Sequence, residues 1–499
     1  MNLHHVKDLV RLGDMLYVFM TKQYKGLDRL LSHSMQDAFY NSASRWPPPR
    51  CHYDSRQDLR TTITNWGIGR SSDIPQQLLW MHGPFGVGKS AIAQSCAESL
   101  ATENKLCASI FFSRPNKRNN PDRVFTSIAY QLAVKFPPIG DILDREILKD
   151  PTILTASRRV QFEELLAKPL QQITSQNSPI EGWVIILDGL DEIDGPTPEV
   201  DGRTAQAEII DIVAKSIRER STPFRWFILS RPEPHIQRAM GANGVSSLLH
   251  TLDLPLSSQD DHEILIFFEK ELDKIREEHH LPSSWCPESD VAVLVKLADG
   301  LWVYVDTVTR FIGDPNSSGP ISQLNLVFNL AKESRGKLSE NPLSRMDLFY
   351  DLIMRQIPPN VVSMVRKILL LDRALGSNAF VLANILGRSR EEFYSYCGFL
   401  QSVLFLKPKT EDSYESIQYY HASFMEYMED PGRSKDFCIY GDVVQELYQE
   451  MIQRLNDVDV HGSSKGMGQI IVVCLIELDQ VHDRIDTSCQ YHISPFKAP

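Results

Sequence analysis

One stretch of the sequence has a clear chemical meaning. It follows the pattern G-x-x-x-x-G-K-[S/T] of a phosphate-binding loop and reads Gly83, Pro84, Phe85, Gly86, Val87, Gly88, Lys89 and Ser90. Glycines let the backbone N–H groups of such a loop point at phosphate oxygens. Lys89 would supply a positive charge for the β- and γ-phosphates, and Ser90 would supply a hydroxyl for Mg²⁺.

The segments on either side of this loop support the interpretation. The apolar run at 78–81 predicts a buried strand, and the run at 91–100, which opens with Ala91, predicts a helix directly after the loop. The N-terminus of that helix would add positive potential toward bound phosphate. An ordinary glycine-rich turn is the alternative, and it is disfavoured because the strand and the helix lie where the motif requires them.

A group of acidic residues follows another apolar run. Residues 183–187 predict a strand that leads into Asp188, Gly189, Leu190, Asp191 and Glu192. Asp188 has the position of the carboxylate that organises Mg²⁺ in phosphate-loop enzymes. Either Asp191 or Glu192 would accept a proton from the attacking water. Taken alone, this loop would be a solvated turn, but its occurrence together with the phosphate loop favours a magnesium site.

Arg231 follows a further predicted strand at 224–229. An arginine at the carboxyl end of a central parallel strand lies beside the nucleotide crevice, where it would sense the γ-phosphate. The alternative is a surface arginine that pairs with a nearby acid. The residues alone do not decide between the two.

Composition restricts the class of protein. The chain has 499 residues, enough for several domains, and a net charge of −12 from 52 basic and 64 acidic residues. This balance argues against nucleic acid as a partner, because binding a polyanion needs clustered Lys and Arg. The eight cysteines are scattered, as is typical of a reducing compartment. No apolar run has the length of a membrane span, so we expect a cytoplasmic protein without a membrane partner.

The pattern of elements predicts the fold class. Strand patterns at 78–81, 106–112, 183–187, 224–229 and 248–254 alternate with helical patterns, which predicts a five-stranded parallel sheet flanked by helices. Between the second and third strands we predict helices at 125–134 and 160–173, separated by a Pro-rich turn. Helical patterns alone follow residue 256, and runs at 403–406 and 417–420 predict the hairpin of a winged helix. We therefore predict the following domains: an N-terminal helical segment with a Pro-rich linker (1–50), a nucleotide-binding domain (51–256), a helical domain (257–330), a winged helix (331–435) and a C-terminal helical tail (436–499). The N-terminal helices would either dock on the next domain or bind a partner.

Four motifs in this order carry a family resemblance: the phosphate loop, DGLDE at 188–192, LSRPEP at 229–234 and YHASF at 420–424. With them the chain resembles the NACHT-type signal-transduction ATPases, which are STAND-class P-loop NTPases related to NOD-like receptors. It is similar in particular to the fungal NACHT proteins of mushroom-forming species, because PPPRCHYDSRQDL at 47–59 resembles the segment that they carry before the phosphate loop. The resemblance covers residues 25–435.

The resemblance implies roles for further residues. Asp191 and Glu192 would be the hydrolytic acids, and Arg231 the sensor arginine. Arg56 would lie near the adenine, and His421 would contact the β-phosphate of ADP in a closed form. A histidine directly after a strand is otherwise an ordinary structural residue, so both interpretations of His421 stay open.

The function implied is an ATP/ADP-dependent molecular switch that hydrolyses ATP slowly, with Mg²⁺, in signalling of the innate-immune-like or self/non-self recognition kind. The ATP state would assemble into homo-oligomers and engage an unidentified protein partner. Two departures stand out: residues 300–302 lack the proline that related switches place against adenine, and no sensor repeats are present. A nucleotide-binding scaffold without turnover and a general P-loop ATPase motor remain as alternatives.

Overall fold

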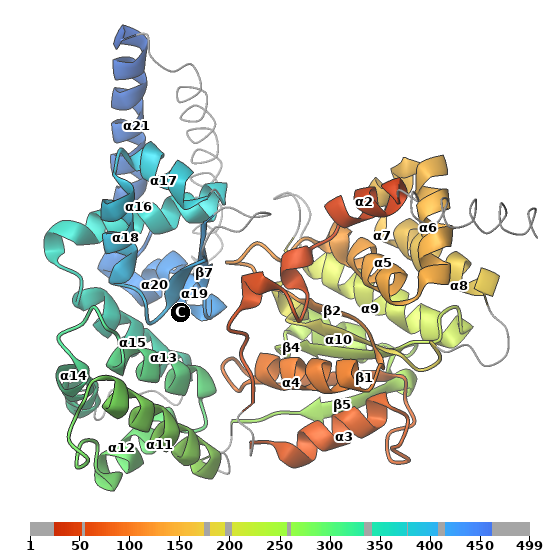
Figure 1. The fold of residues 1–499 in the computed structure, drawn as a ribbon, viewed down its shortest axis with the longest axis horizontal. Coiled ribbons are helices and arrows are strands. Elements are labelled where there is room, and N and C mark those ends of the chain that lie inside the picture. The colour runs from red at the N-terminus through yellow and green to blue at the C-terminus, as the bar shows by residue number, and fades with distance from the viewer. Residues whose placement is uncertain are drawn as a thin grey trace, which may run out of the picture.

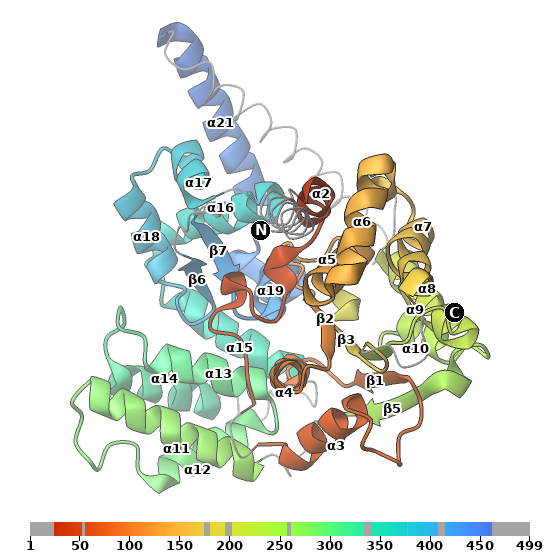
Figure 2. The same cartoon turned by 45° about the vertical axis from the view of Figure 1, so that its right-hand side comes forward.

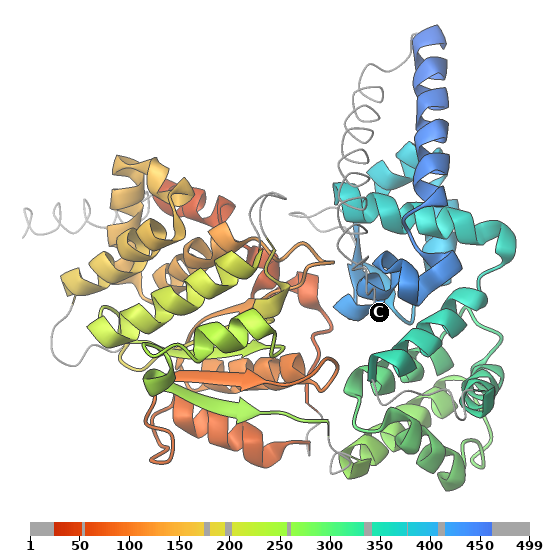
Figure 3. The same cartoon turned by 180° about the vertical axis from the view of Figure 1, so that it is seen from behind.

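The computed structural model describes residues 24–51, 55–173, 180–194, 202–256, 261–333, 342–376, 378–407 and 415–461. The first 23 residues and most of the predicted C-terminal tail lie outside these ranges. Two lobes are visible (Figure 1): a nucleotide-binding lobe that contains the large sheet, and a C-terminal lobe of helices with a small hairpin. Figure 3 shows the same two lobes from behind.

The large sheet has five strands, all paired in parallel, in the order β2-β3-β4-β1-β5. The strands are β1 Leu78–His82, β2 Leu106–Phe111, β3 Val184–Asp188, β4 Arg225–Ser230 and β5 Leu249–Asp253. The predicted five-stranded parallel sheet is therefore confirmed. Because the carboxyl ends of parallel strands meet at one edge, the phosphate loop, the acidic loop and Arg231 are brought to the same edge.

The strands β1 to β4 are buried on both faces, as their continuous apolar runs require, whereas the edge strand β5 is only partly buried. Leu79 and Met81 of β1 pack into one apolar cluster with α3 and α4, whereas Leu78 and Trp80 pack into another with α5, α6 and α9. The helices of this lobe are α2 Lys25–Ser32, α3 Gln57–Gly67, α4 Lys89–Thr102, α5 Val124–Lys135, α6 Pro137–Lys149, α7 Arg158–Phe162, α8 Lys168–Ile173, α9 Gly202–Glu219 and α10 Pro234–Met240.

The N-terminal segment docks on this lobe. Asp144 of α6 accepts hydrogen bonds from the backbone N–H groups of Gly26 and Leu27, at 2.8 and 3.1 Å. These N–H groups open helix α2 and have no partner within it, so the carboxylate of Asp144 satisfies them. Of the two interpretations for the N-terminal helices, the described part supports docking on the next domain.

The C-terminal lobe is helical, with one hairpin. Its helices are α11 Asp261–Glu278, α12 Glu288–Ala298, α13 Trp302–Ile312, α14 Pro320–Glu333, α15 Pro342–Arg355, α16 Pro359–Leu375, α17 Ala379–Leu386, α18 Arg390–Gly398, α19 Ala422–Glu429, α20 Pro431–Ser434 and α21 Asp442–His461. None of the helices in the described part of the chain combines the length and the apolar character needed to cross a bilayer.

A winged helix forms the upper half of this lobe in Figure 1. Helices α16 to α18 are followed by the antiparallel strands β6 Leu404–Lys407 and β7 Ser416–Tyr419, and then by α19. One continuous apolar cluster runs from Ile264 in α11 to Met451 in α21. The helical and winged-helix segments therefore share a core, and the domain boundary at 330/331 stays a prediction, since α14 continues across it.

Candidate nucleotide site

The phosphate loop has the backbone that its glycines permit. Gly86 and Gly88 adopt positive φ angles of 77° and 88°, which other residues rarely adopt. Gly83 packs so closely on the chain after β5 that a Cβ atom there would lie 2.2 Å from the carbonyl oxygen of Leu254. Val87 is fully buried and anchors the loop in the core beneath α3 and α4. The loop is therefore a rigid cradle between β1 and α4.

Lys89 lies across this cradle. Its ammonium group donates hydrogen bonds to the carbonyl oxygens of Gly83 and Pro84, at 2.9 and 2.8 Å. Burial lowers the pKa of Lys89 to about 8, although Asp191 and Asp188 act in the opposite direction. An anion bound in the loop would compensate the buried charge, so the residues present fit a phosphate group. Ala91 lies in the first turn of α4, as predicted.

Ser90 and Asp188 come together as the predicted magnesium pair. Asp188 is the last residue of β3 and is 3% exposed. Burial raises the pKa of Asp188 to about 6, and a hydrogen bond from Ser90 together with the charges of Arg45 and Lys89 acts against this rise. A hydroxyl beside a buried carboxylate offers the oxygen ligands that Mg²⁺ uses next to a nucleotide phosphate. The residues at this position therefore fit the cation.

Arg231 connects the acidic loop with the winged helix. Asp191 accepts a hydrogen bond from the backbone N–H of Arg231 at 2.9 Å, and its carboxylate lies 3.2 Å from Nε of the same residue. The outer guanidinium nitrogens of Arg231 bind both carboxylate oxygens of Glu426 in α19, at 2.8 and 3.3 Å. Burial alone lowers the pKa of Arg231, but Glu426 and Asp191 outweigh it and raise that pKa above its ordinary value. The ring of Phe85 lies 5.5 Å from the guanidinium carbon.

Glu192 is held by the loop that follows β2. Its Oε2 accepts a hydrogen bond from the backbone N–H of Arg114 at 3.0 Å. Burial raises the pKa of Glu192 to about 7, and the neighbouring charge of Asp191 adds to the rise. Because Asp191 is engaged by Arg231 through both oxygens, Glu192 is the better candidate for a proton acceptor near neutral pH.

The start of helix α13 packs directly on the phosphate loop. The backbone N–H of Val303 donates to the carbonyl oxygen of Gly86 at 3.2 Å. A Cβ atom at Gly86 would lie 2.6 Å from the side chains of both Leu301 and Val303. Residues 300–302, which lack the expected proline, therefore still cover the loop, with leucine and tryptophan in its place.

Arg56 and His421 occupy different places relative to the loop. Nη1 of Arg56 donates to the carbonyl oxygen of Val87 at 2.6 Å, so Arg56 contacts the phosphate loop itself. Nε2 of His421 lies 3.2 Å from the carboxylate of Asp306 in α13. His421 thus joins the winged helix to the helix that covers the phosphate loop, and its predicted contact with ADP stays a prediction.

Three contact residues were not found by sequence reasoning: Arg114, Asn116 and Glu426. None belongs to a motif, and each acts across a long separation in the chain, 195 residues in the pairing of Glu426 with Arg231. A helical charge such as Glu426 is indistinguishable in sequence from a solvated surface residue.

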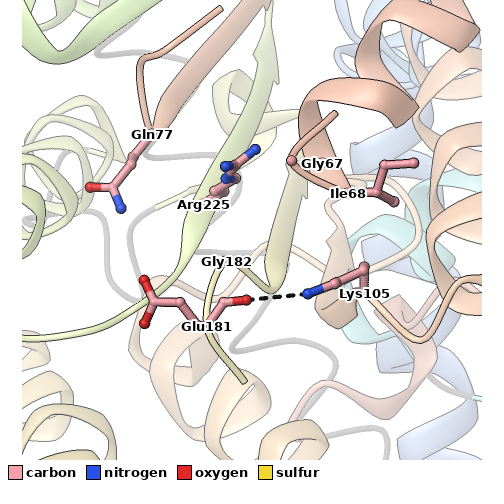
Figure 4. Close-up of a pocket in the computed structure, with 8 residues that line it drawn as sticks. Gly67, Ile68, Gln77, Lys105, Glu181, Gly182 and Arg225 are labelled. Carbon is pink, nitrogen blue, oxygen red and sulfur yellow. Dashed lines mark hydrogen bonds between the residues drawn. The ribbon is translucent and has the colours of Figure 1, made fainter. Parts of the chain in front are cut away.

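A cavity of about 150 Å³ lies elsewhere, at the edge of the sheet where the strands begin (Figure 4). Lys105 and Arg225 line it, and Nζ of Lys105 donates to the carbonyl oxygen of Glu181 at 3.3 Å. Since the phosphate loop follows the carboxyl end of β1, this cavity is separate from the nucleotide site.

Residues 60–231 match the model of a protein family described as Nephrocystin 3, N-terminal. This segment contains the phosphate loop, the acidic loop and Arg231. The geometry of the site defines a P-loop nucleotide-binding domain, and the match covers the same segment. The predicted relationship to NACHT-type ATPases is confirmed over this segment, and the fungal affinity stays a prediction.

Other comparisons add little. A comparison with curated proteins finds no match. Among solved structures, the chain is similar to the Aeropyrum pernix ORC1 protein in complex with DNA, with 12% identity over 76% of this chain and 92% of the other and a TM-score of 0.30. It is also similar to the Aeropyrum pernix ORC2 protein in its ADPNP-ADP complexes, with 14% identity over 80% and 96% and a TM-score of 0.34. Because both scores are low, neither similarity supports an argument about this chain.

Proposed function

We propose that this chain is an ATP/ADP-dependent molecular switch that hydrolyses ATP slowly. One observation carries the proposal: the guanidinium of Arg231, at the nucleotide edge of the sheet, is shared between Asp191 of its own lobe and Glu426 of the winged helix. A single charged group that belongs to both lobes can make the position of the winged helix depend on the nucleotide.

In this proposal each residue of the site has one task. The backbone of the phosphate loop and Lys89 bind the phosphates, and Ser90 with Asp188 holds Mg²⁺. When bound, Mg²⁺ would neutralise charge that develops on the phosphates. Glu192 takes the proton of the attacking water, and Asp191 orients Arg231.

The switching step follows from competition for Arg231. The γ-phosphate of ATP is an anion that Arg231 can bind, and Glu426 is an anion that already binds it. ADP lacks the γ-phosphate and leaves the pair with Glu426 intact. ATP would therefore favour release of the winged helix, and hydrolysis would restore the docked arrangement, as a shift of populations by differential affinity requires.

The first test replaces the competing anion. Glu426→Gln should raise the affinity for ATP roughly tenfold and should not raise the affinity for ADP, because the variant loses a charge-assisted hydrogen bond of the docked arrangement, which contributes on the order of 1.5–3 kcal/mol. The measurement is equilibrium binding of fluorescent ATP and ADP analogues. Glu429→Gln is the matched control, since Glu429 lies on the same helix but pairs with Arg373 of the same lobe at 2.5 Å.

Equal ATP affinities in wild type and Glu426→Gln would contradict the competition. Tight binding of nucleotide with no turnover in a single-turnover assay would favour the scaffold. Fast turnover that is insensitive to Glu426 would favour a motor. Assembly of the ATP state, a protein partner and the absence of a nucleic-acid partner remain predictions; the DNA in the ORC1 structure belongs to that protein.

A second test concerns His421. We propose that its imidazole donates to the β-phosphate of ADP in the docked arrangement, so His421→Ala should weaken ADP roughly tenfold and spare ATP. Asp306→Asn is the control, because it removes the negative charge beside the ring and leaves the imidazole in place; it also weakens the ion pair of Asp306 with Arg310. Equal losses for the two nucleotides, or equal effects of the two variants on ADP, would show that His421 is a packing residue.

A further inference from the structure

The loop at 113–118, directly after β2, makes contacts in two directions. Its ends are tied by backbone hydrogen bonds between Ser113 and Arg118, at 3.1 and 2.9 Å. The loop is therefore a closed turn. It follows β2, and its hydrogen bonds reach the acidic loop on one side and β7 of the winged helix on the other; Figure 2 labels β2, β7 and α19.

One end of the turn binds the acidic loop. Besides the hydrogen bond from its backbone to Glu192, Arg114 donates from Nη2 to the carbonyl oxygen of Asp191 at 3.1 Å. Arg118 is 9% exposed; burial lowers its pKa, and the charges of Asp37 and Glu192 act against this. The turn thus fixes both the backbone of the acidic loop and the carboxylate of Glu192.

The tip of the same turn forms hydrogen bonds with the winged helix. Asn116 exchanges two hydrogen bonds with the backbone of Tyr419 in β7: its Oδ1 accepts from the N–H at 2.8 Å, and its Nδ2 donates to the carbonyl oxygen at 3.1 Å. This is the pairing that another strand would make with the edge of β7. Next to it, Lys117 donates from Nζ to the backbone carbonyl of Asp372, at the end of α16.

We propose that Asn116 and Lys117 are positioning residues that make Glu192 respond to the docking of the winged helix. The inference rests on the proposed hydrolytic role of Glu192. With the winged helix docked, the turn presents the N–H of Arg114 to Oε2 of Glu192, and this bond occupies the oxygen that would accept a proton from water. When the winged helix leaves, the turn loses its tip contacts and Glu192 is released. Docking therefore restrains Arg231 through Glu426 and Glu192 through the turn.

The experiment measures single-turnover hydrolysis at saturating ATP, so that differences in affinity do not enter. Asn116→Ala and Lys117→Met should each speed hydrolysis about threefold to tenfold, the range expected for losing one or two hydrogen bonds from the docked arrangement. Their effects should combine less than additively, because both act on the same equilibrium. Asn119→Ala is the matched control: it is the next asparagine, and in the described part of the chain its side chain makes no recorded hydrogen bond.

A merely structural role predicts the opposite sign, since damage to the site slows hydrolysis. Rates equal to wild type or slower in both variants, with unchanged melting temperatures, would overturn the proposal. If Glu426→Gln speeds hydrolysis while Asn116→Ala does not, the switch stands and the turn has no part in it.

If wild type shows no turnover, the proposed function fails. Hydrogen exchange on nucleotide-free protein still tests whether the turn at 113–118 is coupled to the acidic loop. Asn116→Ala should raise exchange several-fold in a peptide that covers 190–193, with strands β1 and β4 unchanged. No increase at 190–193, or an equal increase throughout the sheet, would overturn the coupling.

Discussion

Replacing Lys89 with alanine should lower the affinity for Mg-nucleotide at least about a hundredfold. Lys89 is the cation of the phosphate loop, and it lies over the carbonyl oxygens of Gly83 and Pro84, where a phosphate would enter. Each charge-assisted hydrogen bond that it makes to phosphate contributes on the order of 1.5–3 kcal/mol, so the loss of two or more accounts for this change. Equilibrium binding of a fluorescent ATP analogue measures it.

The control for this variant is Lys105→Ala. Lys105 directly precedes β2 of the same sheet, at the edge opposite to the phosphate loop, where it lines the cavity of Figure 4 and binds a carbonyl oxygen. The Lys105→Ala variant should bind nucleotide as wild type does, and its melting temperature shows how the loss of a lysine affects the stability of the fold. If Lys89→Ala binds as tightly as Lys105→Ala, residues 83–90 are an ordinary turn.

Most of the fold of the nucleotide-binding lobe could be predicted from local sequence patterns. All five strands were predicted within a few residues; β1 to β4 are buried on both faces and are therefore continuous apolar runs that stand out in the sequence. The topology then brings Ser90 and Asp188 to the same edge of the sheet, since Asp188 ends β3 and Ser90 lies in the first turn of α4, just after the loop that follows β1. Such positions depend on short-range sequence and on the common edge of a parallel sheet.

Helix α6 shows where local interpretation failed. Pro137 and Pro138 suggested a turn between two helices, but they form the first turn of Pro137–Lys149. Proline is well tolerated there, because the first N–H groups of a helix have no partner within it. The prediction of a Pro-rich turn between 125–134 and 160–173 was therefore wrong.

Contacts between the lobes could not be predicted, for a different reason. Asn116 meets Tyr419 across 303 residues, and the pairing depends on how the lobes pack. No local signal distinguishes such an asparagine from one in an exposed turn. The question left open for Arg231, sensor or ion pair, has a related answer: the structure shows the ion pairs with Asp191 and Glu426, and the sensor role is a proposal built on them.

Conversion of Glu192 to glutamine should slow single-turnover ATP hydrolysis by about 10²–10⁴-fold and leave ATP bound, because it removes a general base while the phosphate loop and Asp188 stay in place. Burial raises the pKa of Glu192 to about 7, so the group is protonated and inactive on the acid side. At saturating Mg²⁺ the wild-type rate should therefore rise with pH through about 7, whereas the residual rate of Glu192→Gln should lack this step.

Asp191→Asn serves as the comparison: it keeps the base but loosens Arg231, so it should slow hydrolysis less and retain the step. A wild-type rate in Glu192→Gln, or a pH step that persists in it, would remove Glu192 from the reaction and leave Asp191 as the candidate.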